Sequence, residues 1–208
     1  MADIISKDRR LAQSGTTLAA TLGAQDARLG GRLTAAEAKL LPLVEMLFFA
    51  YRDFTGEADA ILETYGLGRA HHRVLHFVNR CPGIRVADLL ELLKITKQSL
   101  GRVLRQLVAE GWIEQAPGPD DRRERRLTLT EAGRDLAAEL AGLQTRRIDK
   151  ALREIETSNG PQVRENVLGF LFAMIAQDER AAVTAIVDGG RGDEASAGDT
   201  VRTKPEGR

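Results

Sequence analysis

Residues 96–114, TKQSLGRVLRQLVAEGWIE, constrain the possible folds of this chain more than any other segment. Thr96 can cap a helix start, because a threonine hydroxyl accepts a hydrogen bond from a backbone N–H of the first turn. Gly111 can end the helix, because glycine readily adopts the left-handed conformation that commonly follows a helix. Apolar residues between them recur at helical spacing and predict a stripe that faces the core. The stripe consists of Leu100, Val103, Leu104 and Leu107, and the opposite, polar side carries Gln98, Arg102 and Arg105.

The neighbours of this segment predict a helix-turn-helix followed by a β-hairpin. Residues 86–93, VADLLELL, are expected to form a short helix just before it, and two short helices joined by a tight turn are the helix-turn-helix pattern. Residues 112–115 and 126–129 have strand character, and the APGPDDRRER segment between them has the prolines, glycine and aspartates of a turn. Because this hairpin directly follows the second helix, we interpret it as a wing.

The segments on either side are expected to be helical. Thr34 and Glu37 have capping-box spacing, and Pro42 leaves open whether one helix continues through it or a second begins there. Thr130 is expected to cap a long helix that ends at 158–161, SNGP, and whose apolar residues are Leu136, Leu140, Leu143, Ile148, Leu152 and Ile155. Residues 42–54 and 163–176 are apolar on nearly all sides, so each needs something to cover it.

Composition narrows the class of protein. The 208 residues are 43% hydrophobic and only 4% aromatic, which favours a mostly helical chain with one sizeable core. The formal net charge is +0, so binding to a polyanion would depend on a local basic patch. The single cysteine, Cys81, cannot form an intramolecular disulfide, and the apolar runs are shorter than the roughly 20 residues that cross a bilayer. We therefore expect a cytoplasmic protein without a membrane partner.

Residues 68–133 resemble the MarR family of winged helix-turn-helix transcription regulators. The resemblance is carried by LLELLKITKQSLGRVLRQLVAEGWIE, by DDRRERR at the wing tip and by LTLTEAG at 127–133, and with the flanking helices it extends over roughly 40–186. It implies a mostly α fold with a small β-hairpin wing, in a homodimer whose N- and C-terminal helices interlock. The expected division is a flexible arm at 1–33, an N-terminal dimerisation helix region at 34–65, a winged helix-turn-helix domain at 66–130, C-terminal dimerisation helices at 131–187 and a disordered tail at 188–208.

The resemblance places a recognition helix at 96–110 and the wing at 116–126, both directed at double-stranded DNA. The expected recognition-helix contacts are Thr96, Lys97, Gln98, Ser99, Arg102 and Arg105. Of these, Arg102 suits guanine and Gln98 suits adenine, whereas the helix start and Arg105 suit phosphates. The expected wing contacts are Asp121, Arg122, Arg123, Arg125 and Arg126. The family's Asp-x-Arg element implies that Asp121 orients Arg123 for a minor groove, while the other arginines follow phosphates. Simple solubility is the rival explanation for each of these charges.

A small effector is a further expectation, because many members of the family bind aromatic acids between the dimerisation helices and the winged module. Candidate residues for this cleft are Phe48, Tyr51, Phe54, His72 and His76, although residues at helical spacing are more often core. His72 and His76 also have the spacing of a metal pair, but only two ligands are visible, so neither a metal nor a cofactor is expected. Cys81 could respond to oxidation, although a small buried residue is the more ordinary role.

These patterns together predict a sequence-specific DNA-binding regulator, most simply a repressor that occludes a promoter. The alternatives are a winged-helix module that uses the same face to bind a protein, and a metal- or redox-responsive regulator. No Ser/His/Asp set, phosphate-binding loop or paired-carboxylate motif is apparent, so an enzyme is not expected.

Overall fold

The computed structural model describes residues 33–119 and 121–189, and its contacts divide the chain into two compact units, 1–53 and 54–208. Within the first unit, Thr34 and Glu37 form the predicted capping box at the start of the short helix α2, Ala35–Ala38. A second helix, α3, then begins at Leu41 and continues across the boundary between the units to Thr64. Pro42 therefore lies in a first helical turn, where its missing N–H costs nothing.

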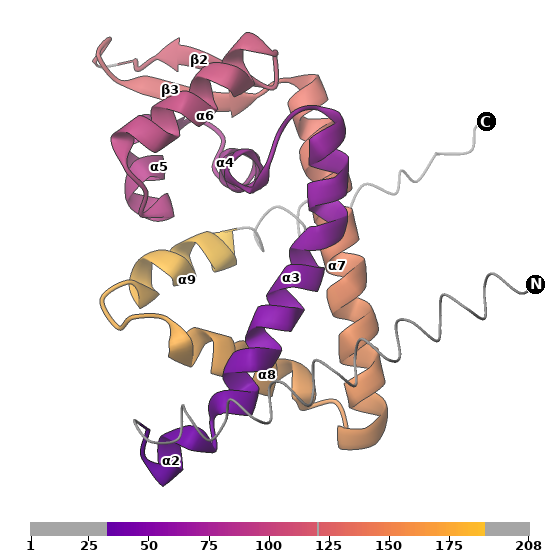
Figure 1. The fold of residues 1–208 in the computed structure, drawn as a ribbon. Helices are drawn as coiled ribbons and strands as arrows, with labels where there is room; N and C mark the ends of the chain where they lie inside the picture. The colour runs from indigo at the N-terminus through magenta and orange to yellow at the C-terminus, as the bar shows by residue number, and fades with distance from the viewer. Residues whose placement is uncertain (1–32, 120, 190–208) are drawn as a thin grey trace, which may run out of the picture. The chain divides into compact units, whose positions relative to one another are not determined.

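The second unit contains the remaining elements and has the winged helix-turn-helix fold that the sequence predicts (Figure 1). After α3 the order is α4 (Arg69–Arg80), β1 (Ile84–Arg85), α5 (Val86–Leu93), α6 (Lys97–Ala109), β2 (Ile113–Pro117), β3 (Arg125–Leu129), α7 (Glu131–Asn159), α8 (Val163–Met174) and α9 (Arg180–Gly189). Helices α5 and α6 form the helix-turn-helix, and the β2–β3 hairpin is the wing.

One hydrophobic core holds the winged module together. The stripe predicted on α6 is buried in full, and leucines and valines from α4 and α5 pack against it. The wing contributes Ile113 at the start of β2, and Leu127 and Leu129 on β3, where the exposed Thr128 lies between the two buried leucines. Each fully buried leucine of this kind stabilises the fold by about 1.5–3 kcal/mol relative to an exposed one.

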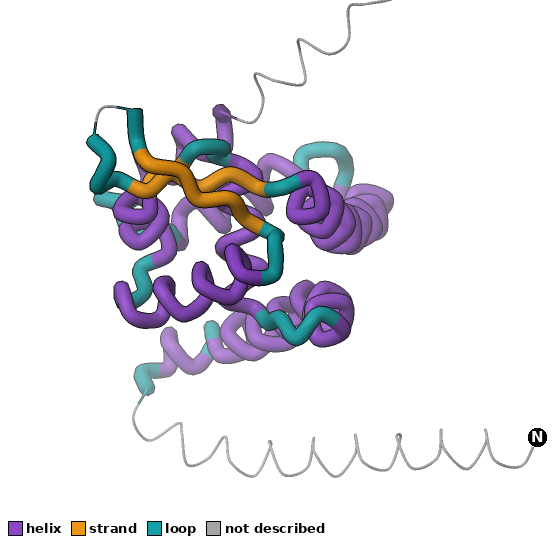
Figure 2. The backbone as a smooth tube through the Cα atoms, turned by 90° about the horizontal axis from the view of Figure 1, so that it is seen from above, coloured by secondary structure: helices purple, strands orange, loops and turns teal. Residues whose placement is uncertain are grey.

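The sheet differs from the predicted hairpin by one strand. Within the described residues it has three antiparallel strands in the order β1-β3-β2, with Ile84 opposite Leu127 and Arg85 opposite Arg126. The strands run side by side and lie toward the viewer in Figure 2, where they are orange. Two residues are too few to show a strand periodicity, which is why the sequence did not indicate β1.

The ends of the wing strands also differ from the prediction. β2 starts at Ile113 and extends to Pro117, and β3 starts at Arg125, because the N–H of Gly118 donates to the carbonyl of Glu124 (3.1 Å) and prolongs the ladder. Trp112, expected in the strand, precedes it, and its ring makes an edge-on contact with Tyr65.

The helix after the wing begins and ends where the sequence predicts. Thr130 caps α7 by accepting a hydrogen bond from the N–H of Gly133, and the helix stops at Asn159 before Gly160. Its predicted apolar stripe is buried only in part, since Leu136, Leu140 and Leu152 are buried whereas Ile148 (47% exposed) and Ile155 are not.

The chain ends were predicted as a flexible arm and a disordered tail. Almost all of both segments lies outside the described residues. The start expected for the tail is wrong, because α9 continues to Gly189.

Among the residues that the structure describes, no helix is both long enough and apolar enough to span a membrane.

Candidate nucleic-acid interface

The start of α6 is held by two hydroxyl groups. The Thr96 hydroxyl accepts a hydrogen bond from the N–H of Ser99 (3.2 Å) and donates one to the Ser99 hydroxyl (2.9 Å). The predicted N-cap is therefore confirmed. Both hydroxyls stabilise the first turn, while the neighbouring side chains of Lys97 and Gln98 are exposed.

Two arginines on the polar face of α6, Arg102 and Arg105, differ in their contacts. Arg102 is exposed, and its side chain makes no hydrogen bond or ion pair within the described residues. Arg105 is also exposed, but its Nε donates to the carbonyl of Gly101 (3.2 Å), so the side chain contacts its own helix. A Cβ at Gly101 would have no neighbour within 4 Å, so the fold does not require glycine there.

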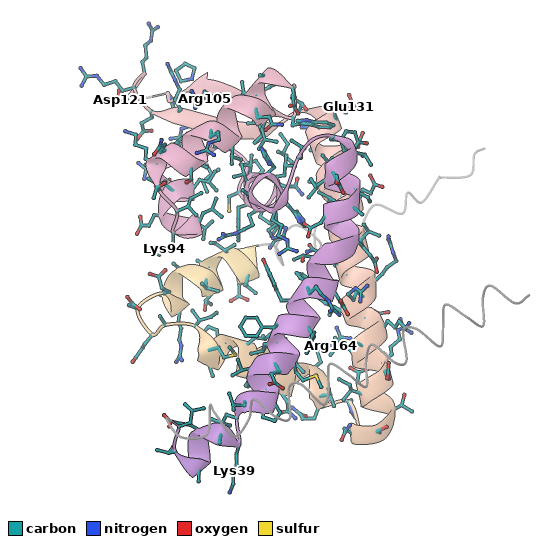
Figure 3. The ribbon with its side chains drawn as sticks, viewed as in Figure 1. Lys39, Lys94, Arg105, Asp121, Glu131 and Arg164 are labelled. Carbon is teal, nitrogen blue, oxygen red and sulfur yellow. The ribbon has the colours of Figure 1, made fainter. Side chains whose placement is uncertain are left out.

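The wing tip is shaped by Asp121, at the outer end of the hairpin (Figure 3). One carboxylate oxygen of Asp121 accepts a hydrogen bond from the backbone N–H of Arg123 (2.8 Å). The aspartate thus fixes the backbone of Arg123 and leaves its guanidinium available. Arg122 contributes only its carbonyl, which accepts a hydrogen bond from Arg125 (3.1 Å), and within the described part of the chain the side chains of Arg122 and Arg123 have no partner.

An ion-pair cluster that the sequence analysis did not identify joins the wing to α5. Arg85 donates two hydrogen bonds to the carboxylate of Asp88 (2.7 and 2.6 Å) and one to Glu124 of the wing (3.1 Å). The other carboxylate oxygen of Glu124 lies 3.7 Å from the guanidinium of Arg126. Arg126, predicted to contact phosphate, therefore has part of its charge offset, and among the residues that the structure describes its buried Nε has no hydrogen-bond partner.

These contacts shift the pKa values of two members of the cluster. Hydrogen bonds to Asp88 and then to Glu124 raise the pKa of Arg85, and the hydrogen bonds from Arg85 lower the pKa of Asp88 despite its partial burial. The i,i+3 spacing of Arg85 and Asp88 was a visible signal for their pair. No local pattern connects Glu124 with Arg85, which is 39 residues away.

A groove of about 840 Å³ lies between α6 and the wing. Its lining includes apolar side chains of α5 and α6 and five cationic residues from β1, α6 and the wing: Arg85, Lys97, Arg105, Arg123 and Arg125. The structure thus places residues of the predicted recognition helix and of the predicted wing around one cavity. Arg102, Gln98 and Arg122 are exposed outside this lining.

The predicted effector residues fall in both units. Phe48 (71% exposed) and Tyr51 belong to the first unit, whereas Phe54, His72 and His76 belong to the second. A cleft formed by all five stays a prediction. His72 is buried, and this burial lowers its pKa. Partial burial also lowers the pKa of His76, whose ring contacts that of Phe77 edge-on.

Two candidate sensors remain, the thiol of Cys81 and a metal ion at His72 and His76. Cys81 is half-buried and is a free thiol. In the segments that the structure describes, no three His, Cys, Asp or Glu side chains are grouped so that they could hold a metal ion.

Comparison with known proteins identifies the class to which this fold and interface belong. The sequence profile of the MarR family matches residues 65–124. The chain is 48% identical over 127 residues to the HTH-type transcriptional regulator PetP of Rhodobacter capsulatus, an alignment that covers 61% of this chain and 72% of PetP. The chain therefore belongs to the MarR family of winged helix-turn-helix transcriptional regulators.

More distant relatives agree with this assignment. The multiple antibiotic resistance protein MarR of Escherichia coli is 25% identical over 95 residues, which are 46% of this chain and 66% of that protein. The crystal structure of reduced MarR from E. coli superposes with a TM-score of 0.52 at 22% identity, over 62% of this chain and 96% of that one. At this identity the superposition shows a common fold.

Proposed function

We propose that this protein is a sequence-specific DNA-binding regulator that reads a duplex with α6 and the wing. The observation that carries the proposal is the state of the basic side chains: Lys97, Arg102, Arg122 and Arg123 are exposed and have no intramolecular partner within the described residues. A solvated arginine of this kind is available to a base edge or a phosphate without breaking an internal contact. The name of the relative PetP, a transcriptional regulator, supports the same function.

The proposed contacts follow from side-chain chemistry. Arg102 can bond guanine O6 and N7 together, and Gln98, one turn earlier, can bond adenine. Lys97, with Thr96 and Ser99 at the helix start, suits a phosphate, as does Arg105. Arg123 is proposed to enter a narrow minor groove, where the negative potential is enhanced. Arg122 and Arg125 are then placed for phosphates, and Arg126 contributes less because Glu124 offsets its charge.

We further propose a homodimer that binds a pseudo-palindromic site. The α8 helix exposes Val167, Leu168, Phe170, Leu171, Phe172 and Met174, and the part of α3 in the first unit exposes Leu43, Val44, Met46, Leu47, Phe48 and Phe49. Exposed apolar surface on this scale is typical of an interaction site. A second copy of the chain would cover it and would present two recognition helices to major grooves roughly 34 Å apart.

Repression by promoter occlusion, in the cytoplasm, is the mode of action that we propose for such a dimer. A small effector bound near Phe48, Tyr51, Phe54, His72 and His76 could release it by changing the spacing of the two recognition helices. Repression and release by an effector are proposed separately from DNA binding. Both are tested by a transcription assay from a promoter that contains the binding site.

DNA binding itself is tested with a duplex selected by the protein. The wild-type protein is used to enrich fragments from a random 30-base-pair library, and its affinity for the best fragment and for a scrambled duplex is measured at several salt concentrations. We expect specific binding. The logarithm of its association constant should fall linearly with the logarithm of the salt concentration, because neutralising phosphates releases counterions. A protein that uses this face for another protein would enrich no fragment.

Two substitutions assign the contacts. Arg123→Ala should weaken binding to the selected duplex by about 1–3 kcal/mol, and Arg102→Ala should also relax the preference at one base pair. Arg153→Ala removes the same charge from an exposed position on α7 and should leave affinity unchanged. Equal losses by Arg102→Ala on selected and scrambled DNA would make Arg102 a phosphate contact, and unchanged affinity in Arg123→Ala would contradict the role of the wing.

A further inference from the structure

Glu124 occupies an unexpected position for an acidic residue in a surface that binds DNA. It directly follows Arg123 and lines the groove between α6 and the wing. A carboxylate there repels phosphates, so charge alone would make it unfavourable for the proposed function. Its contacts suggest a role other than binding.

We propose that Glu124 is a positioning residue, which anchors the wing tip to α5 through Arg85 and so holds Arg123 in place for DNA. This inference rests on the DNA binding proposed above. Arg85 is itself held by the two hydrogen bonds that it donates to Asp88, a residue of α5, so the third hydrogen bond that it donates, to Glu124, joins the wing to a helix of the core. Arg126 lies close to the other carboxylate oxygen of Glu124, at 3.7 Å.

The backbone of Glu124 is fixed as well as its side chain. Its N–H donates to the carbonyl of Asp121 (3.0 Å), and its carbonyl accepts from the N–H of Gly118 (3.1 Å). A Cβ at Gly118 would lie 3.0 Å from the Cβ of Glu124 and 3.1 Å from its carboxylate. Glycine at 118 thus permits the close approach to Glu124 that closes the turn. The turn then determines the position from which the Arg123 side chain extends.

The ion pair between Arg85 and Glu124 is too exposed to contribute much to the stability of the fold. Side chains of Arg85 and Glu124 are 46% and 31% exposed, and ion pairs in such surroundings contribute little to the free energy of folding. Their main contribution is therefore to fix the position of the wing tip. Holding a loop in its bound conformation before binding removes an ordering cost, which improves affinity without any new contact to the ligand.

Glu124→Gln tests this role by the sign of its effect. The substitution keeps the size of the side chain and removes its negative charge, so charge alone predicts tighter binding to every duplex. Anchoring predicts the reverse for the selected duplex: affinity should fall by about 2- to 10-fold, while affinity for the scrambled duplex is unchanged or rises. Glu114→Gln is the matched control, because Glu114 is exposed on β2 of the same hairpin and has no hydrogen bond or ion pair in the described part of the chain.

The partner is tested in a double-mutant cycle. Arg85→Gln alone should also lower the ratio of specific to non-specific affinity, and Glu124→Gln should lower it no further in that background, because the two residues act through each other. Additive losses would show that Glu124 acts independently of Arg85 and would overturn the proposal.

A second readout does not involve DNA. Hydrogen exchange of the Arg123 and Gly118 N–H groups should be faster in Glu124→Gln than in the wild type or in Glu114→Gln. Unchanged exchange, or tighter binding of Glu124→Gln to the selected duplex, would contradict the anchor even though the wild type binds DNA. If the wild type enriches no duplex, the proposed function fails, and the exchange rates still report whether Glu124 anchors the wing.

Discussion

Individual arginines of α6 and the wing carry the same charge but differ in what they contact. Arg102 and Arg123 have side chains without a partner in the described residues, whereas Arg105 and Arg125 donate to backbone carbonyls of their own segments. Arg126 faces Glu124. The sequence predicted all five as DNA contacts, and this stays a prediction. The structure shows which of them already contact another group of the protein.

Buried histidine provides a residue-scale prediction about pH. Burial is the largest cause that lowers the pKa of His72 from its ordinary value of 6.5, and the charge of Asp59 raises it less. Below pH 6.5 the unfolded chain binds a proton that the folded chain binds less well, so the free energy of unfolding should fall as the pH decreases through this window and should be unaffected above it. Urea unfolding between pH 5.5 and 7.5 measures the effect.

The matched variant for that experiment is His72→Gln. It should reduce the pH dependence without abolishing it, because partial burial, His72 and Arg80 also lower the pKa of His76. A slope identical to that of the wild type would show that His72 does not contribute.

At the scale of elements, the junction between wing and α7 depends on one close approach. The carbonyl of Trp112 accepts a hydrogen bond from the N–H of Thr130 (3.2 Å). Thr130 is also the N-cap of α7, because its side chain accepts a hydrogen bond from the N–H of Gly133. A Cβ at Gly133 would lie 2.1 Å from that carbonyl oxygen. Only glycine lets the first turn of α7 pack so near the start of the wing.

Gly133→Ala should therefore destabilise the protein by about 1–3 kcal/mol, because the strand and the helix must separate to admit the methyl group. Gly101→Ala is the control within α6, where open space surrounds the added carbon, and it should stabilise the fold by about 0.5–1 kcal/mol through helix propensity. Urea unfolding compares the two variants. A Gly133→Ala variant as stable as the wild type would refute the tight junction.

For the whole molecule, the distribution of apolar surface is the basis of the homodimer proposed above. The winged module buries its leucines thoroughly, whereas α8 leaves apolar side chains such as Leu171 (49% exposed) uncovered, and Ile148 and Ile155 of α7 are also exposed. The first unit has the same character, with Phe48 and Met46 among its exposed residues. A second protomer would account for all these surfaces.

Leu171→Asp should raise the dissociation constant of the proposed dimer at least about tenfold, since it places an unpaired charge in an apolar interface. Asn166→Asp introduces the same charge at a polar position of α8 and should leave the dimer intact. Sedimentation equilibrium measures both, and circular dichroism checks that each variant retains its helices. A wild-type protein that is monomeric at micromolar concentration would refute the dimer.

Most of the helices, the caps at Thr34, Thr96 and Thr130, and the wing could be predicted from the sequence, because periodicity, capping and turn chemistry act between residues a few positions apart. The family followed from the resemblance of 68–133 to the MarR family, and the candidate DNA contacts that the resemblance implies stay a prediction. Only the tertiary structure decided that β1 joins the sheet, that Gly133 meets Trp112 and that Glu124 binds Arg85, 39 residues away. These features depend on how distant segments meet, and a charged side chain carries no local mark of the partner that the fold will bring to it.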